Sequence, residues 1–108
     1  MAMTPELRSV LDELKGRLEG LYGARLARLV LYGSQARGDA GPHSDIDLLI
    51  VLREPVRPGE EIARTSRDVA EISLAHDAVI MSVFVSESDY LQRQGPFLRN
   101  VRREGIVL

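Results

Sequence analysis

Residues 29–52 read LVLYGSQARGDAGPHSDIDLLIVL and place a Gly-Ser turn and two carboxylates between two apolar runs. The first run is typical of a buried strand, and Gly33-Ser34 ends it. Ten residues separate this turn from Asp45 and Asp47, which open the second apolar run. The pattern predicts two strands whose ends bring the turn and the acidic pair together.

The acidic pair lies at the start of a predicted strand, so its two side chains should project from the same face. Asp47 stands between Ile46 and Leu48, and an unpartnered charge in a half-buried position costs several kcal/mol. A hard divalent cation removes that cost. Mg²⁺ prefers oxygen ligands and is commonly held by one or two carboxylates together with substrate phosphates. The pair is therefore a candidate magnesium site.

The Gly-Ser turn supplies features suited to a phosphate. Gly33 can adopt backbone angles that other residues resist, and Ser34 offers a hydroxyl and a helix-capping oxygen. If a short helix runs from Ser34 to Arg37, its free N–H groups and the Arg37 guanidinium could both face a nucleoside triphosphate. Taken singly, a Gly-Ser pair is usually a turn, and Arg37 or Ser44 alone would be solvated surface.

Together these residues resemble the DNA polymerase β-type nucleotidyltransferases, and above all their minimal nucleotidyltransferase (MNT) group. The resemblance rests on a motif within residues 33–48: Gly33-Ser34, ten residues, then Asp45-x-Asp47, with Ala36-Arg37-Gly38 and Ser44 between them. It implies an α/β (α+β) fold, a mixed β-sheet flanked by helices. It also implies Mg²⁺-dependent transfer of a nucleoside monophosphate, with AMP from ATP the expected group. The resemblance further implies pairing with a HEPN-domain toxin, which is frequent for MNT proteins; in several such pairs the MNT protein is the antitoxin and adenylylates the toxin.

The resemblance also implies site roles. Gly33, Ser34, Arg37 and Ser44 would bind the nucleotide, and Asp45 and Asp47 would bind the metal. Enzymes of this type usually carry a third carboxylate on a neighbouring strand, and Asp77 is the candidate for it as a further catalytic and metal-binding residue.

Asp77 has an equally simple interpretation as a surface residue at a strand end. In that case Val79, Met81 or Ser82 would occupy the place of the third acid, and the protein could bind nucleotide while turning over slowly or not at all. His43, two residues before Asp45, could assist proton removal, although an exposed loop histidine is the simpler interpretation.

Composition bounds the class of protein. At 108 residues with a formal net charge of −2 we expect one nucleotidyltransferase domain spanning residues 1–108, with no bulk attraction for nucleic acid or anionic membrane. There is no cysteine, and no apolar stretch approaches the roughly 20 residues of a membrane span. A cytoplasmic protein without membrane association is the expectation.

The remaining chain predicts further elements. A helix should begin at Thr4-Pro5-Glu6 and end near Gly20 and Gly23, with an apolar stripe at Leu7, Val10, Leu11, Leu14, Leu18 and Leu21. A second helix should run from Glu60 to about Ala75, with Ile62, Val69 and Ile72 on its buried side. Residues 78–85 predict a central strand covered on both faces. A short helix capped by Ser86 and a last helix over residues 96–103 follow, and the arginines there suggest a solvated face rather than a binding patch.

Three functions remain open at this stage. The first is an enzyme whose acceptor hydroxyl comes from a partner protein or an RNA end. The second is a non-catalytic nucleotide-binding antitoxin or regulatory subunit that occludes its partner. The third is a subunit that modifies nucleic-acid ends and uses the C-terminal arginines.

Overall fold

The computed structural model describes residues 3–41 and 44–108. Its elements, in chain order, are α1 (Pro5–Tyr22), a 3₁₀ turn η1 (Gly23–Arg25), β1 (Leu26–Tyr32), α2 (Gly33–Arg37), β2 (Ile46–Leu52), α3 (Pro58–His76), β3 (Ile80–Ser86), α4 (Glu87–Gln92), α5 (Pro96–Glu104) and β4 (Ile106–Val107). None of the helices in these ranges combines the length and apolar character that crossing a membrane requires.

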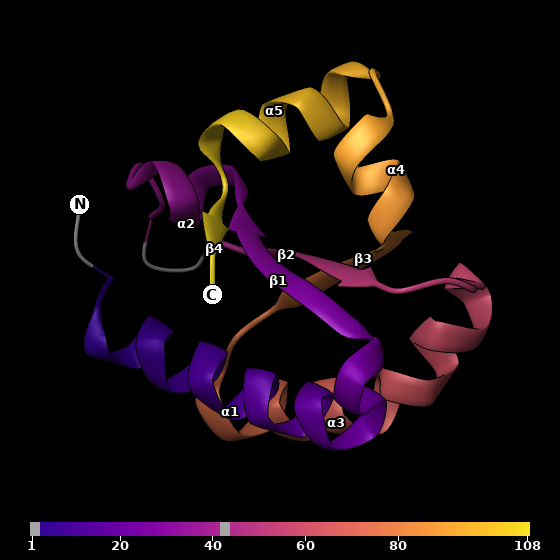
Figure 1. Cartoon of the computed structure of the whole chain (residues 1–108). Coiled ribbons are helices and arrows are strands. Elements are labelled where there is room, and N and C mark those ends of the chain that lie inside the picture. The colour runs from indigo at the N-terminus through magenta and orange to yellow at the C-terminus, as the bar shows by residue number, and fades with distance from the viewer. Residues whose placement is uncertain (1–2, 42–43) are drawn as a thin grey trace.

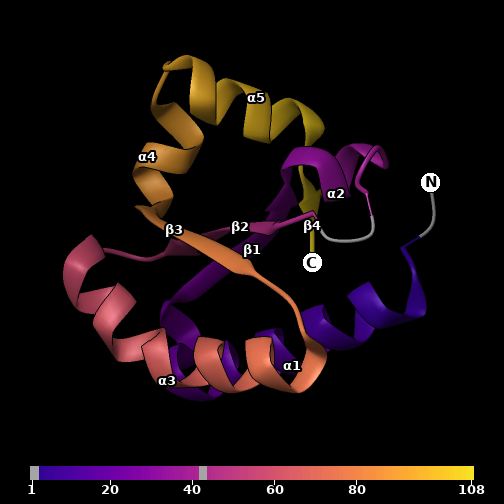
Figure 2. The same ribbon diagram turned by 180° about the vertical axis from the view of Figure 1, so that it is seen from behind.

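The four strands form one mixed sheet in the order β3-β2-β1-β4. β2 and β3 are parallel, whereas β1 is antiparallel to both of its neighbours, β2 and β4. Helices α1 and α3 cover one face of the sheet, and α4 and α5 lie on the other, as Figure 1 and the reverse view in Figure 2 show. The expected mixed sheet flanked by helices is confirmed.

Helix α1 forms as its capping and apolar spacing predict. The Thr4 hydroxyl accepts a hydrogen bond from the Leu7 N–H at 3.1 Å, Pro5 is the first helical residue, and Gly23 ends the helix with a φ of 53°. The expected stripe from Leu7 to Leu18 is buried. Leu21 is 42% exposed, and Tyr22 occupies the buried position at the end of the stripe instead.

Helix α3 differs from expectation in what it buries. Ile72 is buried as predicted, but Ile62 is 53% exposed, while Glu61 and Thr65 are buried. The Tyr22 hydroxyl donates to the Glu61 carboxylate at 2.8 Å, and the Thr65 hydroxyl donates to the Glu61 carbonyl at 2.9 Å. Satisfied hydrogen bonds make this polar burial tolerable, and such pairing cannot be read from apolar periodicity.

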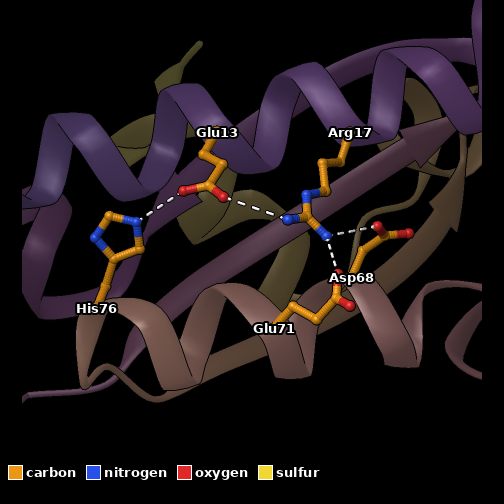
Figure 3. Close-up of polar contacts among 5 residues, drawn as sticks. All are labelled: Glu13, Arg17, Asp68, Glu71 and His76. Carbon is orange, nitrogen blue, oxygen red and sulfur yellow. Dashed lines mark hydrogen bonds and ion pairs between the residues drawn. The ribbon is translucent and has the colours of Figure 1, made fainter.

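A row of charged side chains spans the gap between α1 and α3 (Figure 3). The Arg17 guanidinium donates to Asp68 at 3.0 Å and to Glu71, and it also pairs with Glu13 at 3.4 Å. His76 Nε2 lies 2.8 Å from the other Glu13 oxygen, and this hydrogen bond is the main reason that the pKa of Glu13 is lowered. These contacts connect the two helices beside the core, and each partly exposed pair contributes little to stability.

Strand β3 is not central, which corrects the prediction for residues 78–85. Among the described strands it pairs with β2 alone and forms one edge of the sheet. Val79 and Met81 are 54% and 49% exposed, whereas Phe84 is buried and Val83 packs on the side of α4 and α5. The prediction relied on apolar content. An edge strand that helices partly cover can be as apolar as a central strand, so this content does not distinguish the two.

The C-terminal segment begins as expected. The Ser86 hydroxyl accepts from the Asp89 N–H at 3.1 Å and caps α4, and Pro96 is the first residue of α5. Arg102 donates to two backbone carbonyls, at Tyr90 and Arg93, so it holds α5 to the end of α4. Strand β4 was not predicted; its two residues pair with β1 and add the sheet's other edge.

Candidate active site

The Gly-Ser turn and Asp47 meet because of the β1–β2 register. Tyr32, the last residue of β1, is directly opposite Asp47, so Gly33 follows at the height of that carboxylate. Gly33 has a φ of 73°, and a Cβ atom there would stand 3.3 Å from Asp47 Cγ and closer still to a carboxylate oxygen. Glycine is required here for both its backbone angle and the absence of a side chain.

The acidic pair combines one exposed and one half-buried carboxylate. Asp45 stands just before β2, and Asp47 is in the strand on the same face as Leu49 and Val51, the face that α4 and α5 cover. Burial is the main cause that raises the pKa of Asp47, and the charge of Asp45 adds to it, with partial relief from Arg37. Among the described residues the Asp47 carboxylate has no hydrogen bond or ion pair, so this negative charge is poorly compensated.

Helix α2 is a short helix that starts at the turn, one residue earlier than expected. It spans Gly33–Arg37 and ends at Gly38, whose φ is 81°. The Ser34 carbonyl accepts the N–H groups of Gly38 and Asp39, at 3.0 and 3.1 Å. Ser34 itself is half-buried in the first turn, where helical N–H groups lack partners within the helix.

Arg37 and Ser44 both have partners within the chain. The Arg37 guanidinium donates to Asp39 at 3.2 Å and lies 3.7 Å from Glu104 of α5; the contact with Asp39 is the main cause that raises the pKa of Arg37. The Ser44 hydroxyl, just before the acidic pair, accepts from the Gly41 N–H at 2.8 Å. Their expected roles in nucleotide binding remain predictions.

Asp77 is separated from the acidic pair. It ends α3 with a left-handed backbone, φ 50° and ψ 51°. Together with Val10 and Ile46 it lines a pocket on the side of the sheet that α1 covers. Asp47 faces the other side. Within residues 3–41 and 44–108, no three His, Cys, Asp or Glu side chains could together hold a metal ion. The role of Asp77 as a third carboxylate stays a prediction; in the structure Asp77 caps the C-terminus of α3 and does not stand on a strand.

Met81 occupies the place beside Asp47. The parallel β2–β3 register makes the two residues direct neighbours, and Met81 shares its face with Val83 and Val85, which pack toward α4 and α5. Of the three residues considered for this place, Met81 is therefore the one that fills it. His43 lies outside the described residues.

Two aromatic residues that sequence reasoning missed complete this end of the sheet. The Tyr32 ring makes an edge-to-face contact with Phe97 of α5, with centroids 5.4 Å apart and an interplanar angle of 84°. Burial, and secondarily the charge of Asp47, raises the pKa of Tyr32. The position of Tyr32 directly before the Gly-Ser turn was the only available signal in the sequence.

A mixed sheet with a Gly-Ser turn beside a pair of carboxylates is the arrangement that the resemblance to nucleotidyltransferases implies. Residues 11–103 match the nucleotidyltransferase domain family, and the chain belongs to that family.

Two relatives from Methanocaldococcus jannaschii extend over most of the chain. The protein named "Putative protein adenylyltransferase MJ0604" is 31% identical over 100 residues, which are 91% of this chain and 93% of the relative. A second protein of the same kind, MJ0141, is 28% identical and covers 77% of this chain and 83% of its own length.

Solved structures agree in fold. The structure described as "a putative nucleotidyltransferase from Sulfolobus solfataricus" has a TM-score of 0.62 at 18% identity, covering 96% of this chain and 86% of that one. A chain from a toxin-antitoxin crystal structure with AMP-PNP has a TM-score of 0.61 at 19% identity, with coverage of 89% and 70%. A chain from a mutant form of the MntA-HpeT toxin-antitoxin gives 0.57 at 22% identity, with 90% and 70% coverage.

Proposed function

We propose that this nucleotidyltransferase transfers AMP from ATP, with Mg²⁺, to a hydroxyl group of a partner protein, and that the partner is a HEPN-type toxin that it neutralises as an antitoxin. The observation that carries the proposal is the placement of Gly33 against Asp47, with Asp45 beside it. A turn at the start of a helix, next to a poorly compensated acidic pair, is suited to a metal-bound triphosphate.

The relatives and the similar solved structures support AMP as the group transferred and a protein as the partner. Two relatives that span most of the chain are named as protein adenylyltransferases, so AMP and a protein acceptor are the first choices. Chains of the same fold occur in toxin-antitoxin complexes, one of them with the ATP analogue AMP-PNP. A toxin partner and ATP are consistent with these relationships.

The donor set fits a magnesium ion. Asp45 and Asp47 would hold it, since both supply carboxylate oxygens and their mutual repulsion falls when a cation lies between them. Bound Mg²⁺ would stabilise negative charge on the phosphate oxygens. Gly33 leaves room for the phosphates, and the N–H groups at the start of α2 would donate hydrogen bonds to them.

The reaction joins the acceptor hydroxyl oxygen to the α-phosphorus. The bond from that phosphorus to the oxygen bridging to the β-phosphate breaks, and pyrophosphate leaves with the bonding electron pair. The hydroxyl proton must pass to a base. The β-strand neighbours of Asp47 in its row are Tyr32 and Met81, neither of which is a base at neutral pH, so the proton goes to the acidic pair, to solvent or to the partner.

Met81 favours a second candidate function. A thioether beside Asp47 provides neither a metal ligand of the kind Mg²⁺ prefers nor a proton acceptor. The protein could therefore bind nucleotide and neutralise its partner by occlusion, with little or no transfer.

Purification of the untagged protein from its native cell tests the two functions. We expect a co-purifying protein to gain label from ATP labelled in the α-phosphate and none from ATP labelled in the γ-phosphate, in a Mg²⁺-dependent manner. Asp47→Asn should abolish the labelling. A tightly bound partner that never gains label would favour occlusion, and the absence of any partner would contradict both.

A further inference from the structure

Three side chains form a row across the sheet at the active-site end. Tyr32 of β1, Asp47 of β2 and Met81 of β3 are direct neighbours in the strand register and project toward the face that α4 and α5 cover. The carboxylate is central, and an apolar group stands on each side of it. These two ends are therefore the apolar surfaces beside Asp47 on which the base of a nucleotide could stack if its phosphates lie at Asp47 and Gly33.

The β1 end of the row extends into an exposed aromatic surface. Phe97 is the second residue of α5 and is 44% exposed, although Leu98 and Val101 of the same helix are 3% exposed. The edge-to-face contact with Tyr32 fixes its ring 5.4 Å from the tyrosine ring. An exposed aromatic ring that is held in one orientation loses little side-chain entropy when a planar ligand stacks on it.

Helix α5 is itself attached to the candidate site. Its last residue, Glu104, lies 3.7 Å from Arg37 of α2, and α2 begins at Gly33. Figure 1 shows α5 and α2 side by side above the same end of the sheet. Phe97, near the other end of α5, is linked to the site through its ring contact with Tyr32, the strand neighbour of Asp47.

We propose that Phe97, supported by Tyr32, stacks on the base of the bound nucleotide and sets the affinity for it. The inference rests on the proposed function only in that it takes the phosphates to lie at Gly33 and the acidic pair. An aromatic face suits this role better than Met81 at the other end of the row, since bases stack on aromatic side chains with substantial affinity. Stacking accepts every base, and we expect purines to bind more tightly than pyrimidines because their rings offer a larger stacking area.

Calorimetry with two probes separates base binding from phosphate binding. In the presence of Mg²⁺, Phe97→Ala should weaken ATP binding about tenfold or more. The same substitution should leave the binding of inorganic tripolyphosphate, which has no base, unchanged. Phe97→Trp should bind ATP at least as tightly as the parent. Leu91→Ala is the matched control, because Leu91 is 51% exposed on the neighbouring helix α4.

Phe97→Leu separates a loss of stacking from a loss of folding, because leucine keeps most of the apolar volume but has no aromatic face. It should lose ATP affinity while its melting temperature stays close to that of the parent. The proposal is overturned if Phe97→Leu binds ATP as the parent does, if it weakens ATP and tripolyphosphate equally, or if Met81→Ala causes the ATP-specific loss instead. If the parent protein binds neither probe, the proposed function fails together with this inference.

Discussion

The Asp47 carboxyl group fills the space that a side chain at position 33 would occupy, with Asp47 Cγ 3.3 Å from the place of a Gly33 Cβ atom. The turn and the acid are therefore one structural unit rather than two neighbouring features. Because Tyr32 pairs with Asp47, the β1–β2 register fixes this contact, and anything that shifts the register would separate the phosphate-binding turn from the metal ligands.

Gly33→Ala should destabilise the protein by about 2 kcal/mol or more, because alanine resists the left-handed backbone and its methyl group would displace Asp47. Urea unfolding measures the change. Gly16→Ala is the control: Gly16 lies inside α1 with nothing near its Cβ position, so the substitution should stabilise by about 0.5–1 kcal/mol. Equal stability of Gly33→Ala and the parent would contradict the described contact.

Asp47→Asn should raise the melting temperature of the metal-free protein at pH 7. The folded state raises the pKa of Asp47, chiefly through burial, so the ionised form destabilises the fold as pH rises through that pKa. An amide stays neutral. The advantage of the variant should shrink as the pH falls below about 4, where the carboxyl is protonated in both states. Melting curves recorded in EDTA from pH 3 to pH 8 measure this advantage. A difference in melting temperature between the variant and the parent that stays constant over this range would refute the electrostatic explanation.

Local structure was largely predictable from the sequence. The Thr4 cap, Pro5 and the apolar spacing defined α1, and Pro96 marked the start of α5. These signals depend on residues that are close together in the sequence, so they can be read without knowing the tertiary contacts. The Gly-Ser turn and the acidic pair were brought together as expected, since two adjacent antiparallel strands suffice to join them.

Features that depend on distant partners were not predictable. β4 has only two residues, too few for an alternating pattern, and it exists because β1 offers a free edge. Glu61 is buried because Tyr22, 39 residues away, donates to it. Likewise, the choice between Asp77 and Met81 as the neighbour of Asp47 depended on where α3 ends and on the β2–β3 register, neither of which periodicity determines.

Met81→Asp should convert the pair of carboxylates into a group of three. We expect Mg²⁺ affinity to rise on the order of tenfold, because affinity for hard cations grows with the number of charged ligands. Without metal, the added repulsion should lower the melting temperature. Met81→Asn is the control, since it adds polarity without charge and should change Mg²⁺ affinity little. An unchanged Mg²⁺ affinity in Met81→Asp would mean that position 81 does not face the metal.

A metal-nucleotide site at the acidic pair is tested most directly by calorimetric titration of ATP, with and without Mg²⁺, into the parent, Asp47→Asn and Asp12→Asn. Asp12 is an exposed aspartate of α1 and serves as the control for the loss of one charge. We expect Mg²⁺ to tighten ATP binding strongly in the parent and in Asp12→Asn, and Asp47→Asn to lose this dependence. ATP binding that is indifferent to Mg²⁺ in the parent, or equally Mg²⁺-dependent in Asp47→Asn, would contradict such a site.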